Sequence, residues 1–99
     1  MAKRFQAPFL QVVDNNGGWR APRLSTPAVY PDGYAARAND LDLSFEPSPN
    51  DGGIAAAAGG APAIKIEWAD EAEAAIARAV KAAGDEKLCA VVDARLADA

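Results

Sequence analysis

Three neighbouring carboxylates form the densest group of chemically capable side chains in this 99-residue sequence. Asp70, Glu71 and Glu73 could share acid–base work if burial separated their pKa values. Acidic residues also gather in the first turn of a helix, where they cap backbone N–H groups and favour the positive end of the helix dipole. The spacing therefore predicts a helix start with Asp70 as N-cap and Glu73 completing an acidic capping box.

The residue types that are missing exclude several kinds of site. The sequence has no His and one Cys, which excludes Ser-His-Asp and Cys-His arrangements, His-ligated metals, internal disulfides and Cys-cluster zinc. Cys89 stands between apolar neighbours, which predicts a buried structural thiol. The loops at 14–18 and 50–53 lack the spacing of calcium or phosphate motifs and indicate turns. We expect no enzyme activity, catalytic residue, cofactor, metal or small-molecule substrate.

Charge is divided unevenly along the chain, whose net charge is −4. Residues 1–39 carry a net +3 and residues 40–99 a net −7. This asymmetry fits docking on a mixed-charge neighbour, and it also fits solubility alone. No basic run is interleaved with aromatics, and no stretch of about 18 apolar residues occurs, so we expect neither nucleic acid nor membrane as a partner. Without a secretory signal, synthesis is expected in the cytoplasm.

Proline and glycine divide the chain in two. All seven prolines and seven of the eight glycines lie in residues 1–62. The sequence therefore predicts an extended arm of short strands and turns over 1–62, with no helix longer than about two turns. A strand with one or two helices should follow in 63–99 as an anchor, in a single α+β domain. The core should be thin, because 25 residues are Ala and only 19 are Leu, Ile, Val or Phe.

The arm contains two runs that indicate strands. Residues 9–13 are apolar and end in a polar turn, after which 19–24 could return as a hairpin partner. Residues 41–46 alternate between apolar and polar side chains, as a half-buried strand does. Residues 54–63 indicate a linker of small residues, because glycines and a proline oppose the helix that their alanines favour.

The anchor begins with an alternating run at 64–68, which predicts a strand. Residues 69–83 are rich in helix formers and predict a helix whose apolar stripe is Ile76, Val80 and Ala83.

The last element is ambiguous. Leu88, Val92 and Leu96 recur every four residues, which favours a helix over 87–93. The same residues also fit a buried strand, which would make 64–92 a strand-helix-strand unit. We favour the helix, because Ala, Arg and Leu continue to residue 97.

Large aromatic side chains are concentrated in the arm. Such groups on a segment with little regular structure suggest anchors that insert into pockets of a neighbouring protein. They could equally build a local mini-core. The candidate partner-binding residues are Phe5, Phe9, Trp19, Tyr30 and Tyr34.

Residues 4–17 (RFQAPFLQVVDNNG) resemble the opening of head-binding domains in the tail fibres and tailspikes of tailed phages. The chain departs from that pattern at residues 18–22, where the family continues with a second strand. The resemblance implies a virion-associated structural protein without a fibre region.

Two functions from different classes are compatible with these features. The first is a non-enzymatic structural or interaction protein, a small phage capsid or tail accessory subunit located in the virion, whose aromatic arm lies on neighbouring subunits of a larger assembly. The second is a small acidic inhibitor or antitoxin-like regulator in the cytoplasm, which would mask a basic site on a partner protein.

Overall fold

A computed structural model describes residues 1–38 and 43–96. It contains helices and strands together, which confirms the predicted mixture of both element types. In chain order the elements are α1 (Ala2–Phe5), β1 (Leu10–Asn15), α2 (Arg20–Val29), α3 (Tyr34–Arg37), α4 (Asp51–Gly59), β2 (Ala63–Ile66), the 3₁₀ helix η1 (Ala69–Glu71), α5 (Ala72–Gly84) and β3 (Ala90–Arg95).

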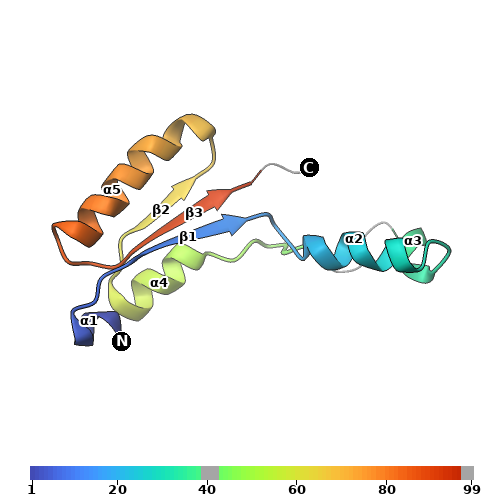
Figure 1. The fold of residues 1–99 in the computed structure, drawn as a ribbon, viewed down its shortest axis with the longest axis horizontal. Coiled ribbons are helices and arrows are strands. Elements are labelled where there is room, and N and C mark those ends of the chain that lie inside the picture. Colours follow the sequence, from blue (N-terminus) through green and yellow to red (C-terminus); the bar gives the residue numbers. More distant parts are fainter. Residues whose placement is uncertain (39–42, 97–99) are drawn as a thin grey trace. The chain divides into compact units, whose positions relative to one another are not determined.

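The three strands form one parallel sheet in the order β1-β3-β2 (Figure 1). The last strand of the chain is therefore the central one. Leu10 lies opposite Ala90 across β1 and β3, and Ile64 lies opposite Val92 across β2 and β3. Both outer strands pair with β3 alone among the described residues, so each has one open edge.

Helices α4 and α5 cover opposite faces of this sheet (Figure 1). The chain crosses from β1 over β3 to reach β2, and it then returns from β2 to β3 through α5. Right-handed crossovers that run in opposite directions place their helices on opposite faces. Both helices pack against β2 and β3.

The core under α5 is built mainly from alanine. Three alanines of α5 lie against the buried residues of β2 and β3, and small side chains allow the helix to approach the sheet closely. Val92 is the one large side chain that is fully buried among the described residues. The buried cluster consists of Ile66, Ala75, Ala79, Ala82, Ala90 and Val92.

The buried stripe of α5 differs from the predicted one. Residues 69–84 are helical as expected, but Ala75, Ala79 and Ala82 face the sheet. Ile76 and Val80, which the sequence placed in the core, are 45% and 54% exposed. The stripe is rotated by one residue, because alanines fill the narrow space above β3 where larger side chains would push the helix outward.

Residues 90–95 form the central strand, so the helix favoured over 87–93 is wrong and the strand alternative is correct. A central parallel strand is buried on both faces, and it therefore shows a continuous apolar run without clear alternation. The four-residue recurrence of Leu88, Val92 and Leu96 arises by coincidence within that run. Residues 63–95 thus form the strand-helix-strand unit.

Two helices within 1–62 exceed the predicted limit of two turns. Helix α2 has ten residues and tolerates Pro22 because the N–H groups of a first helical turn have no intrahelical partner. Helix α4 has nine residues where a linker was expected. The Asn50 side chain accepts a hydrogen bond from the Gly53 N–H at 2.8 Å, and Gly60 ends the helix with a φ of 72°. Asn50 and Gly60 therefore mark the ends of α4, and residues 55–58 form its body.

The chain divides into two compact units at boundaries other than residue 62. Among the described residues, one unit combines residues 1–15 with residues 50–96, and the other lies within residues 16–49. The predicted boundary differs because β1, from the arm, pairs with β3 near the end of the chain. The strand predicted at 9–13 is confirmed by β1.

The unit of residues 16–49 contains α2 and α3, which contact each other. Residues 20–29 are helical and do not return as a hairpin partner of β1. The strand predicted at 41–46 lies partly outside the described residues, and of its described part Ser44 forms an isolated antiparallel bridge to Gly18. A Cβ at position 18 would overlap the carbonyl oxygen of Leu43, so this bridge requires glycine.

Candidate functional site

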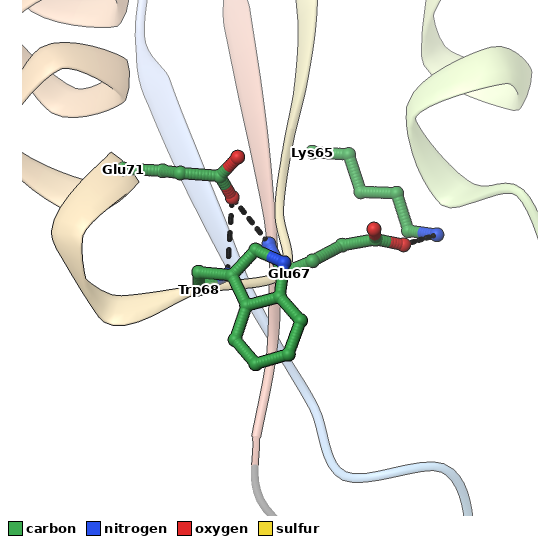
Figure 2. Close-up of polar contacts among 4 residues, drawn as sticks. All are labelled: Lys65, Glu67, Trp68 and Glu71. Carbon is green, nitrogen blue, oxygen red and sulfur yellow. Dashed lines mark hydrogen bonds and ion pairs between the residues drawn. The ribbon is translucent and has the colours of Figure 1, made fainter.

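The acidic cluster lies where β2 leads into α5, and its contacts are structural (Figure 2). One carboxylate oxygen of Glu71 accepts hydrogen bonds from the backbone N–H groups of Glu67 at 2.9 Å and Trp68 at 3.0 Å. These two bonds lower the pKa of the exposed Glu71 carboxyl below its ordinary value. Glu71 therefore performs the capping that the sequence assigned to Asp70, for which the structure shows no side-chain cap.

Figure 2 also shows an ion pair between two exposed side chains near Glu71. The ammonium group of Lys65, in β2, lies 2.6 Å from a carboxylate oxygen of Glu67, the residue that follows the strand. The hydrogen bond and the charge of Glu67 raise the pKa of Lys65, and the more distant Asp93 raises it further. Both side chains of the pair are exposed, so the pair contributes little to stability.

Asp93 is the buried charged residue that sequence reasoning missed. It lies on the central strand between Val13 and Lys65 in the strand register, and its side chain is 7% exposed. Its Oδ1 atom has no hydrogen-bond partner among the described residues. The signal in the sequence is the apolar run that Asp93 follows directly, because a central parallel strand is buried on both faces.

The five predicted partner-binding aromatics are all exposed, by fractions between 52% and 81%. Phe5 and Phe9 belong to the sheet unit, and the Arg4 guanidinium lies 5.7 Å from the centre of the Phe5 ring. Trp19 belongs to the other unit and contacts Phe45 edge-on, with ring centres 6.1 Å apart. Tyr30 and Tyr34 lie in the same unit as Trp19, at the end of α2 and the start of α3.

Trp68 is a further exposed aromatic, at the end of the strand predicted at 64–68. Strand β2 ends at Ile66, so the alternation no longer determines the direction of the Trp68 side chain. The side chain is 71% exposed.

Exposed apolar side chains are also found on α5 and β1, which contact each other. Ile76 and Val80 are one turn apart on α5, and the right-handed β2-α5-β3 crossover places their flank on the side of β1. Val12 shares its strand face with Leu10, which packs into the core under α5, and Val12 is itself exposed. We call Val12, Ile76 and Val80 the edge patch.

The outer edge of β1 also presents backbone groups. The carbonyl oxygens of Phe9 and Asn15 accept hydrogen bonds from β3 and Leu96, so odd-numbered residues of β1 face β3. The peptide groups of Leu10, Val12 and Asp14 therefore point outward. The Val12 carbonyl accepts a bond from the Gln11 side chain, and no described strand pairs with this edge.

A cavity of about 400 Å³ lies at the amino ends of the three strands. Residues within two positions of the start of each strand line it, namely Phe9, Ala61 and Cys89, and Val91 of β3 also contributes. Cys89 is half-buried there, so its thiol is more accessible than the buried thiol that the sequence predicts.

Comparisons with known protein families, curated proteins and solved structures find no match to this chain. Among residues 1–38 and 43–96, no helix is long and apolar enough to cross a membrane. The same residues contain no group of three His, Cys, Asp or Glu side chains arranged to hold a metal ion.

Proposed function

We propose that this chain is a non-enzymatic interaction protein that functions as a subunit bound to neighbouring protein subunits. The observation that carries the proposal is the rotation of α5. Its alanines face the sheet, while Ile76 and Val80, the largest apolar side chains on the helix, remain exposed, as does Val12 of β1, the strand that α5 also contacts. Large apolar side chains gathered on one surface are typical of protein–protein contacts.

The open edge of β1 supports the same function. Sheets made only of parallel strands are normally enclosed, and an exposed strand edge readily pairs with another chain. The outward peptide groups of β1 and the edge patch belong to the same side of the sheet unit. A strand of a neighbouring subunit, placed on this edge, would form hydrogen bonds with the outward peptide groups of β1. An apolar helix of the same subunit, placed beside α5, would cover the edge patch.

The exposed aromatics provide further candidate anchors. Phe5 and Phe9 belong to the same unit as the edge patch, and Trp19, Tyr30 and Tyr34 belong to the other. Exposed aromatic side chains contribute large contact energies when a partner covers them. The virion setting that the resemblance of residues 4–17 implies stays a prediction, and the interaction function does not depend on it.

Hydrogen exchange on the isolated chain, combined with light scattering to determine its mass, tests the proposal. We expect weak amide protection over residues 9–45 in the monomer and increased protection when the chain associates. Val80→Lys should reduce association, whereas Ala77→Lys, at an exposed position outside the edge patch, should not. Strong protection across 9–45 in a confirmed monomer contradicts the proposal and favours the compact inhibitor.

A further inference from the structure

The cavity at the amino ends of the strands has the chemistry of a small-molecule site. It has a volume of about 400 Å³, which lies within the range of ligand-binding cavities. Its walls come from α1, from α4 and from the segments that lead into each strand. All of these segments belong to one compact unit.

The side chains that line the cavity are mainly apolar, and those that carry a charge are all positive. Phe9, Ala58 and Val91 are among its apolar residues, and its charged residues are Lys3 and Lys87. No acidic residue contributes to it among the described residues. The Lys87 ammonium donates one hydrogen bond to the Gly84 carbonyl, which leaves two further donors. An apolar cavity that is lined by two lysines and by no acidic residue is complementary to a ligand with an aliphatic tail and an anionic head.

We propose that this cavity binds a medium-chain aliphatic carboxylate, with its tail against Phe9, Ala58 and Val91 and its carboxylate beside Lys3 and Lys87. The tail is driven into the cavity by the removal of apolar surface from water. The head forms charge-assisted hydrogen bonds with the ammonium groups.

Calorimetric titration of the full chain with decanoate, below the concentration at which decanoate forms micelles, is the direct test. We expect saturable binding at one site, and a gain of about fourfold in affinity for each methylene added from hexanoate to decanoate. Decylamine, which has the same tail and the opposite charge, should bind at least tenfold more weakly than decanoate.

The Cys89 thiol provides a second readout, because it lines the cavity. Bound decanoate should slow the reaction of Cys89 with a thiol reagent, with the same midpoint as the calorimetric titration. Ala58→Trp should fill the cavity and remove both effects. Circular dichroism on each variant verifies that it is folded.

Substitution of the two lysines distinguishes a specific binding site from nonspecific adsorption to an apolar surface. Lys3→Gln combined with Lys87→Gln should weaken decanoate binding about tenfold or more, whereas Lys81→Gln, which is outside the cavity, should leave it unchanged. Equal binding of decanoate and decylamine overturns the proposal. Failure of decanoate to protect Cys89 in the folded wild-type chain overturns it as well, and neither result affects the proposed subunit function.

Discussion

The Glu71 carboxylate accepts a hydrogen bond from the backbone N–H of Trp68 at 3.0 Å, and the same oxygen holds the N–H of Glu67. The Glu71 side chain, in the first turn of the helical segment, thereby binds the backbone of the connection that follows β2. The N–H groups before a helix have no backbone partner of their own, and this carboxylate supplies one. The connection positions α5 over the sheet, so Glu71 affects the packing of the whole sheet unit.

Glu71→Ala should lower the melting temperature of the chain, because two backbone N–H groups then lose their charged acceptor. Asp70→Ala is the matched control, since Asp70 is adjacent, acidic and without a capping bond. We expect this control to leave the melting temperature unchanged. A larger loss from Asp70→Ala than from Glu71→Ala in thermal unfolding contradicts the assignment of the cap to Glu71.

The same contact predicts a dependence of stability on pH. The pKa of Glu71 in the folded chain lies below its ordinary value of 4.5, because the two backbone N–H groups stabilise the carboxylate. Its contribution to stability is therefore present above pH 4.5 and is lost as the pH falls through the folded pKa. Urea unfolding at several pH values should show the gap between wild type and Glu71→Gln closing under acid. A gap of constant size across the acid range contradicts this prediction.

Two glycines of α4 should respond in opposite directions to alanine. A Cβ at Gly52 would lie 2.8 Å from the Cβ of Ala63, so Gly52→Ala should destabilise the chain by about 1–3 kcal/mol. A Cβ at Gly59 meets nothing within 4 Å. Gly59→Ala should therefore stabilise the chain by about 0.5–1 kcal/mol through the loss of conformational freedom in the unfolded state. Urea unfolding of both variants measures the difference, and equal effects would show that α4 does not pack on β2.

The close approach of α5 to the sheet should make its alanines sensitive to added volume. Ala79 has no exposed surface, and Ala79→Leu should cost about 1–3 kcal/mol through overpacking. Ala77 is exposed on the same helix, so Ala77→Leu should change stability by no more than about 0.5 kcal/mol. A tolerated leucine at position 79 in chemical unfolding would mean that the larger residues, and not the alanines, face the core.

Local chemistry allowed several elements to be predicted. The strand at the start of the chain, the strand at 63–66 and the helix at 69–84 follow from apolar alternation and helix-forming residues that act within each segment. The acidic helix start was also predictable, but the capping residue was not. The first turn is a 3₁₀ turn that begins at Ala69, and this shift moves the capping role from Asp70 to Glu71.

Helix α2 shows where residue preferences mislead. Proline and glycine counts predicted an extended arm, yet Pro22 stands in a first turn that does not need its N–H, and Pro27 stands within the helix. The count of such residues carries less information than their position within an element. Asn50 and Gly60 at the two ends of α4 illustrate the same point.

The sequence by itself determined that the chain combines helices with strands, that its core is thin and that its acids gather at the start of a helix. The tertiary structure decided that β3 is the central strand, that alanines of α5 face it and that Asp93 is buried between β1 and β2. The physical reason is that the burial of a side chain depends on which residues of a neighbouring strand or helix lie opposite it. A run such as residues 88–92 satisfies helix and strand patterns alike until partners on both sides supply its hydrogen bonds. Likewise, the choice between Ala79 and Val80 for the core depends on the distance between the helix and the sheet, which no local pattern encodes.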